Sequence, residues 1–117
     1  MHQILLVEDD FLVALCTSTA LVEGGYGVVH AENAAQARQA LETDGFAALV
    51  TDINLGDGES GFDIARHWRT LQPHRPVVFV SGADAFRHAA EGVQPSDLIT
   101  KPFEPEQVLA ALGKWLH

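Results

Sequence analysis

The chain has 117 residues, of which 47% are hydrophobic and 20% are charged, so we expect one packed domain over residues 1–117 and no wholesale disorder. Seven basic and 16 acidic residues give a formal net charge of −9. We therefore expect no direct binding to nucleic acid, because a phosphate backbone repels an anionic surface. The single cysteine, Cys16, excludes an internal disulfide. The apolar runs are too short to span a membrane and no secretion signal is seen at the start, so we expect a soluble cytoplasmic domain.

Short apolar runs alternate with amphipathic segments along the whole chain. In chain order we predict a strand and a helix five times over, at residues 3–7 and 11–22, 27–31 and 32–42, 46–51 and 62–71, 77–80 and 84–91, and 97–100 and 106–116. The run at residues 3–7 is continuously apolar, which is typical of a strand covered on both faces. The order therefore indicates an α/β fold, a flavodoxin-like doubly wound parallel sheet of five strands in the order 2-1-3-4-5 with five helices.

Spacing within the predicted helices indicates which side chains face the core. We expect Leu12, Leu15 and Val22 of the first helix to be buried, with Cys16 as a packing residue. Further core positions on the later helices are Ala34, Ala37, Ala40, Leu41, Ile64, Ala65, Trp68, Leu71, Val108, Leu109, Leu112, Trp115 and Leu116. Asn33 is the expected N-cap of the second helix, and Pro105 fits the first turn of the last one.

The polar residues that could carry chemistry follow the strands directly. Glu8 and Asp9 follow the first strand, Asp52 the third, Ser81 the fourth and Lys101 the fifth. The ligand crevice of an open α/β sheet lies outside these strand ends, and the first and third strands are neighbours in the expected order. We therefore expect Glu8, Asp9 and Asp52 to converge, whereas Asp10 can act simply as a helix cap.

Three carboxylates in one crevice repel each other, and a hard cation such as Mg²⁺ removes the conflict. Lys101 adds a positive charge and Ser81 a hydroxyl, which together with a carboxylate nucleophile suit phosphoryl transfer. A cis peptide at Lys101-Pro102 would aim the ammonium into the crevice. The six histidines show no spacing typical of a metal site.

These residues stand in motifs that cover nearly the whole chain. The motifs are Ile4-Leu5-Leu6-Val7-Glu8-Asp9-Asp10, Gly25-Tyr26-Gly27-Val28, Ala35-Gln36-Ala37, Leu49-Val50-Thr51-Asp52-Ile53-Asn54-Leu55, Gly61-Phe62-Asp63, Val77-Val78-Phe79-Val80-Ser81-Gly82 and Lys101-Pro102-Phe103. In this order the chain resembles a response regulator receiver domain of two-component signalling, from the chemotaxis-regulator-like family.

The resemblance implies a role for each residue of the crevice. Asp52 would accept the phosphoryl group, and Asp9 and Asp52 would bind Mg²⁺ directly. Glu8 would act through a metal-bound water, and Asn54 would add its backbone carbonyl. Ser81 would bind a phosphoryl oxygen, and Lys101 would pair with the phosphoryl group.

The resemblance also implies the partners and the mode of action. The phosphoryl group would come from a histidine kinase, a histidine phosphotransfer protein or a small phosphodonor. The phosphorylated domain would contact a downstream target protein or effector domain, as a monomer or a weak phosphorylation-dependent homodimer. Such a domain is a switch in a phosphorelay rather than a turnover enzyme.

Three positions depart from the family pattern. Leu98 stands three residues before Lys101, where an aromatic residue usually rotates inward on phosphorylation. Gly56 follows Leu55 where many members have proline, which predicts a more mobile loop, and Gly82 replaces a small side chain after Ser81.

Two other functions are compatible with parts of the pattern. A Mg²⁺-dependent phosphatase-like hydrolase on a similar sheet would use a second aspartate two residues after its nucleophile, but Asn54 occupies that position and cannot shuttle a proton. A phosphorylation-insensitive interaction module is favoured only by Leu98.

Overall fold

The computed structural model describes residues 1–43, 45–56, 58–82 and 94–116. Its strands are β1 (Gln3–Val7), β2 (Gly27–Ala31), β3 (Phe46–Asp52), β4 (Val77–Ser81) and β5 (Ser96–Thr100). Its helices are α1 (Phe11–Glu23), α2 (Ala34–Leu41), α3 (Gly61–Leu71) and α5 (Pro105–Trp115). The helix that we predicted at 84–91 lies outside these residues, so four of the five predicted helices are observed.

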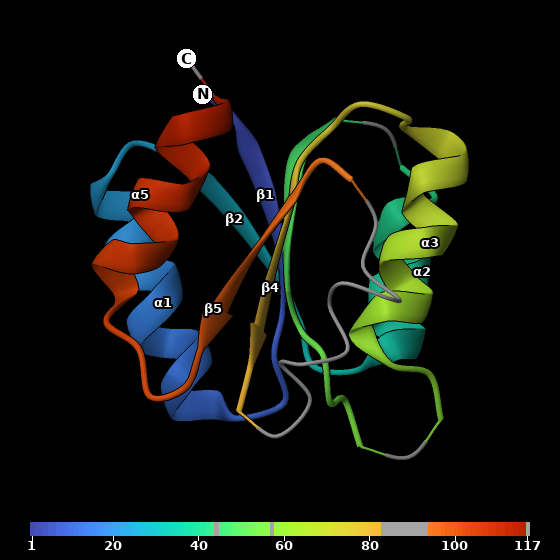
Figure 1. The fold of residues 1–117 in the computed structure, drawn as a ribbon, viewed down its shortest axis with the longest axis horizontal. Helices are drawn as coiled ribbons and strands as arrows, with labels where there is room; N and C mark the ends of the chain where they lie inside the picture. The colour runs from blue at the N-terminus through green and yellow to red at the C-terminus, as the bar shows by residue number, and fades with distance from the viewer. Residues whose placement is uncertain (44, 57, 83–93, 117) are drawn as a thin grey trace.

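The five strands form one parallel sheet in the order β2-β1-β3-β4-β5. Helices α1 and α5 cover one face, and α2 and α3 cover the other (Figure 1). The predicted doubly wound fold is confirmed, and the order places β1 directly beside β3, with Val7 opposite Thr51. All five strands therefore end at the same edge of the sheet, the lower edge in Figure 1.

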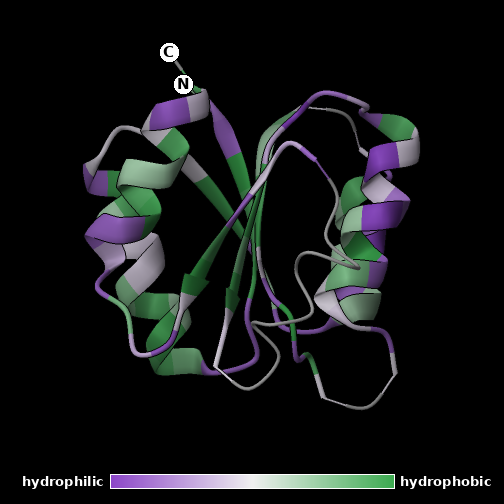
Figure 2. Cartoon of the chain, viewed as in Figure 1, coloured by the Kyte–Doolittle hydropathy of each residue, from purple (hydrophilic) through white to green (hydrophobic). Residues whose placement is uncertain are grey.

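Successive residues of each strand point to opposite faces, so the apolar strands supply two cores (Figure 2). Leu5, Val7 and Phe79 pack under α2 and α3, whereas Ile4 and Leu6 pack under α1 and α5. The rings of Phe62 and Phe79 lie 5.0 Å apart in the first of these cores. The apolar runs of β1, β3 and β4 are thus explained by burial on both faces.

The predicted inward face of α1 is wrong. Leu12, Leu15 and Val22 are 69%, 49% and 58% exposed, and Cys16 is exposed as well. The buried residues of this helix are instead Ala14, Thr17 and Leu21. Two of these three residues are small, so most of the large apolar residues of α1 lie outside its buried face.

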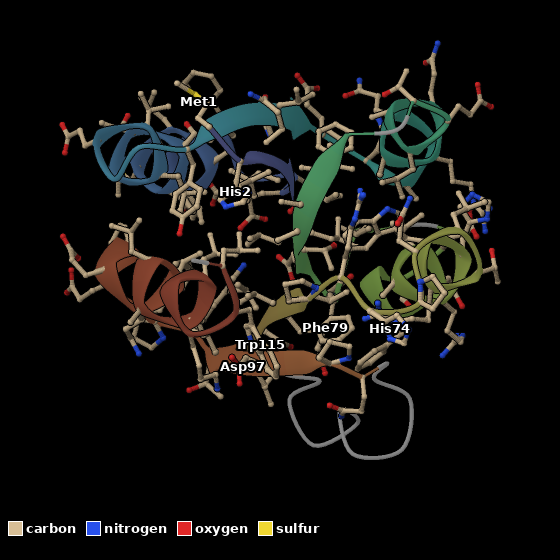
Figure 3. All side chains as sticks on the ribbon, turned by 90° about the horizontal axis from the view of Figure 1, so that it is seen from above. Met1, His2, His74, Phe79, Asp97 and Trp115 are labelled. Atoms are coloured by element: carbon tan, nitrogen blue, oxygen red, sulfur yellow. The ribbon has the colours of Figure 1, made fainter. Side chains whose placement is uncertain are left out.

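Two residues near helix ends also lie further out than we predicted. Leu71, the last residue of α3, is 51% exposed, and Trp115, the last residue of α5, is 37% exposed. The indole Nε1 of Trp115 donates a hydrogen bond to Asp97 Oδ2 on β5 at 2.9 Å, and Figure 3 shows the two side by side. The polar tip of the indole thus keeps Trp115 at the rim instead of in the core.

The segment after Asp52 is fixed by the start of α3. Ser60 caps this helix, and Asp63 completes a capping box by accepting the Ser60 backbone N–H at 2.9 Å. Gly61 N donates to Ile53 O at 2.8 Å, which brings the first turn of α3 against the end of β3. A Cβ on Gly61 would lie 2.2 Å from the Asp52 carbonyl oxygen, so this close approach requires glycine.

Gly61→Ala should therefore lower the free energy of unfolding by about 1–3 kcal/mol, because the added methyl group forces α3 away from Asp52. Urea denaturation measures the change. Gly113→Ala is the matched control, since no heavy atom lies within 4 Å of its added Cβ, and helix propensity should raise stability by up to about 1 kcal/mol. A Gly61→Ala variant as stable as the parent would contradict the packing described here.

Candidate functional site

Three acidic side chains meet where β1 and β3 end. Glu8 and Asp9 follow β1, and Asp52 is the last residue of β3. One carboxylate oxygen from each lies within 4.8 Å of the others. Glu8 and Asp52 are only 3% and 6% exposed, whereas Asp9 is exposed to solvent. The structure thus brings together the three acids that the sequence analysis placed at this edge.

Lys101 reaches the same place from the end of β5. Its Nζ lies 2.8 Å from Asp52 Oδ2 and 3.5 Å from Glu8 Oε1. The Lys101 backbone N–H donates to Ser81 O at 3.0 Å, and the Lys101-Pro102 peptide is cis, as we expected. Partial burial acts to lower the pKa of Lys101, but the carboxylates of Asp52 and Glu8 outweigh it and raise the pKa above its ordinary value. Lys101 is therefore a charged partner of the acidic cluster.

A hollow of about 340 Å³ opens above these groups. It is lined by Asp9, Asp52, Asn54, Gly56, Ser81, Gly82 and Lys101. Ser81 is buried at its wall. The hollow is large enough for a tetrahedral oxyanion next to Asp52, with a hydroxyl and an ammonium on its walls.

Asn54 is held by hydrogen bonds on both sides. Its backbone N–H donates to Asp52 Oδ1 at 3.1 Å, and its side-chain Oδ1 accepts the Gly56 N–H at 3.1 Å. The Asn54 side chain thus fixes the loop after β3, and its backbone runs along the edge of the hollow.

The cluster carries an electrostatic cost in the absence of a cation. Burial, followed by the charge and hydrogen bonding of Asp52, raises the pKa of Glu8 to about 8, and Lys101 only partly offsets this. Mg²⁺ prefers carboxylate oxygens as ligands and keeps several of its own water molecules. The residues present therefore fit a magnesium ion, and Glu8, Asp9 and Asp52 are the ones that could hold it.

Two neighbours of the site complete its surroundings. Asp10 is the N-cap of α1, accepting the backbone N–H groups of Leu12 and Val13 on Oδ1, which agrees with the expected cap. His30 Nε2 lies 2.8 Å from Glu8 O, a contact that the sequence analysis missed. Its position near the end of β2, beside β1, was the signal that could have revealed it.

Leu98 is half-buried and packs against the core under α2 and α3. It lies opposite Phe79 in the β4–β5 pairing, three residues before Lys101. A branched aliphatic side chain here fills part of the core.

An apolar groove of about 580 Å³ adjoins the site on the side of α1. It is lined by Leu12, Val13, Cys16, Thr17, Lys101, Pro102, Phe103 and Pro105. Two apolar residues of α1, Leu12 and Val13, thus lie in the same groove as Lys101. Phe11, the first residue of α1, is 70% exposed.

Known proteins share the sequence pattern and the fold of this chain. The sequence model of the response regulator receiver domain matches residues 4–113. The response regulator receiver protein CpdR of Brucella abortus is 30% identical over 99% of this chain and 98% of its own length. The alginate biosynthesis transcriptional regulatory protein AlgB of Pseudomonas putida is 32% identical, but the chain spans only 26% of it.

Solved structures extend the similarity to three dimensions. A response regulator receiver protein from Sinorhizobium medicae has a TM-score of 0.94 and 30% identity, covering 98% of this chain and 94% of that one. The chemotaxis response regulator CheY4 of Vibrio cholerae, at 22% identity, has the same fold with a TM-score of 0.87 over 99% of both chains. Among the helices that the structure describes, none is long and apolar enough to cross a membrane.

Glu8→Gln should stabilise the metal-free protein at about pH 8 by roughly 1–3 kcal/mol. The folded protein holds the Glu8 proton up to a pKa of about 8, against 4.5 ordinarily, so the parent loses stability as pH rises through this window. The glutamine side chain is neutral at every pH, so the Glu8→Gln variant does not lose stability in this way. Urea unfolding in a chelator at several pH values measures the difference, which should vanish near about pH 4. The control is Asp10→Asn, which removes an exposed neighbouring charge and keeps a cap oxygen. If the stability of Glu8→Gln and that of the parent changed in parallel with pH, the raised pKa of Glu8 would be contradicted.

Proposed function

The chain belongs to the response regulator receiver family, the phosphoaccepting domains of two-component signalling, and we propose that its phosphoacceptor is Asp52. The observation that carries this proposal is the position of the Asp52 carboxylate, which lies in the hollow with Lys101 Nζ at 2.8 Å and the acidic pair beside it. Among the described residues that line the hollow, Asp9 is the other carboxylate, and it is exposed.

In the proposed reaction, a carboxylate oxygen of Asp52 attacks the phosphorus of a phosphohistidine. The bond between phosphorus and the new carboxylate oxygen forms as the phosphorus–nitrogen bond breaks. The electron pair of the broken bond stays on the imidazole nitrogen, which takes up a proton. The products are an acyl phosphate on Asp52 and a free histidine, so the domain acts as a regulatory switch and not as an enzyme with turnover.

Each neighbour of Asp52 has a part in this transfer. Asp9 and Asp52, with the backbone carbonyl of Asn54, would hold Mg²⁺ directly, and Glu8 would act mainly through a bound water. The bound cation would neutralise charge on the phosphoryl oxygens. Lys101 exchanges its contact with Asp52 for a phosphoryl oxygen, and the Ser81 hydroxyl donates a hydrogen bond to another.

The groove beside α1 is where we place the phosphodonor protein. It adjoins the hollow because Lys101 lines both, and its apolar wall includes Leu12, Val13 and Phe103. A helix carrying the phosphohistidine and an apolar stripe would bury these exposed side chains and reach Asp52. The partner is therefore a histidine kinase or a histidine phosphotransfer protein.

Output would follow from protein contacts of the phosphorylated domain in the cytoplasm. The chain covers about a quarter of AlgB, a transcriptional regulatory protein, but nearly all of CpdR, a receiver protein. The target of the phosphorylated domain would be an attached effector domain or a separate protein. With a net charge of −9, the domain itself would not bind nucleic acid. We propose that the domain is a monomer or a weak phosphorylation-dependent homodimer.

Asp52→Asn should abolish phosphorylation by acetyl phosphate and Mg²⁺, because an amide oxygen is not nucleophilic enough to form the acyl phosphate. Intact-protein mass spectrometry in acid should find one phosphoryl group on the parent, one on the control Asp10→Asn and none on Asp52→Asn. A chelator should abolish the gain in the parent. An equal gain on Asp52→Asn would refute the proposal, and sustained hydrolysis of a small phosphoester would favour the phosphatase-like alternative.

Leu12→Ser should slow transfer from a phosphohistidine protein by about ten-fold or more, since an apolar anchor of the groove is lost. Phosphorylation by acetyl phosphate should be unchanged, because Asp52 is untouched. Val22→Ser is the matched control, since Val22 is 58% exposed on the same helix but does not line the groove. Equal effects of both variants, or loss of the acetyl phosphate reaction, would place the donor elsewhere.

A further inference from the structure

The loop between β3 and α3, residues 53–60, carries Asn54 and Gly56 to the edge of the hollow. Leu55 is buried between them in the core under α2 and α3. Beyond it, Gly56 and Gly58 have φ angles of +87° and +97°. Glycine has the greatest backbone freedom of all residues, so Gly56 and Gly58 contribute little backbone stiffness of their own.

A forked ion pair joins the far side of this loop to α2. Arg38, in the last turn of α2, donates from Nε and from Nη2 to the two carboxylate oxygens of Glu59. These hydrogen bonds lower the pKa of Glu59 and raise that of Arg38, so both groups are charged. Asp63 also faces Glu59, but its carboxylate is bonded to Ser60 and Arg66. Arg38 is therefore the specific partner of Glu59.

We propose that the Arg38–Glu59 pair positions the magnesium site by holding the β3–α3 loop, and with it the Asn54 backbone, against the hollow. This inference rests on the proposed function. Both atoms of each fork are engaged, which fixes the orientation of Glu59 as well as its distance. Leu55 packs in the core and Glu59 is bonded to Arg38 of α2, so Gly56 and Gly58 each have a restrained neighbour. Arg38 and Glu59 are positioning residues and touch neither the cation nor the phosphoryl group.

Two isosteric variants separate this role from a simple effect of charge. Arg38→Gln removes a positive charge, and Glu59→Gln removes a negative one. If only the long-range field mattered, the first would tighten Mg²⁺ binding and the second would weaken it. If the pair holds the loop, both should weaken Mg²⁺ binding by about two- to five-fold, the range expected for an exposed ion pair. Titration with Mg²⁺ alone, followed through the amide NMR signals of Asn54 and Gly56, gives the affinity.

The double variant and a matched control complete the test. Arg38→Gln with Glu59→Gln should be no weaker than either single variant, because the interaction can be lost only once. The charge swap Arg38→Glu with Glu59→Arg should restore most of the affinity. Arg66→Gln breaks a comparably exposed pair with Asp63 on α3 and should change the affinity by less than about 1.5-fold. Unfolding measured without Mg²⁺ verifies that each variant folds.

The outcomes also separate this inference from the proposed function. If the parent binds Mg²⁺ and accepts a phosphoryl group while Arg38→Gln and Glu59→Gln keep its affinity, the positioning role is wrong and the function stands. Shifts of opposite sign in the two variants would overturn the inference in favour of simple electrostatics. If the parent itself fails to bind Mg²⁺ or to be phosphorylated on Asp52, the proposed function fails with it.

Discussion

Repulsion among buried acids is the constraint on which this molecule depends. Glu8 and Asp52 are held almost out of water by neighbouring parallel strands, and Asp9 lies beside them. Such a cluster is tolerated only with compensating positive charge. Lys101 supplies one positive charge from β5, yet burial and the charge of Asp52 still raise the pKa of Glu8. The three acids could hold a divalent cation, which would add the missing positive charge.

The sheet is what enforces this proximity. The central strands β1, β3 and β4 are buried on both faces, so their register is fixed by two apolar cores at once. The strand ends cannot relax apart without exposing these cores. Gly61 adds a second restraint by bringing α3 onto the backbone of Asp52. The energy that keeps like charges together therefore comes from hydrophobic burial far from the charges themselves.

The fold and the convergence of the acids were predictable, because both follow from the order of apolar runs and from the polar residue after each run. The exposed face of α1 was not. Leu12, Leu15 and Val22 follow helical spacing as well as Ala14, Thr17 and Leu21 do, and hydrophobicity alone favours the larger set. Only the neighbouring strands and α5 decide which set is inward. The contact of His30 with Glu8 and the pairing of Arg38 with Glu59 likewise depend on tertiary geometry that spacing along the chain does not encode.

The exposed position of Cys16 has a practical consequence. It is the only thiol of the chain, and it lies on the wall of the apolar groove next to Lys101. A nitroxide or an environment-sensitive dye attached there would sense the approach of another molecule to this surface without any engineered residue. The same position makes the surface vulnerable, since an oxidant that adds bulk to the sulfur would obstruct the groove while leaving the acidic hollow open.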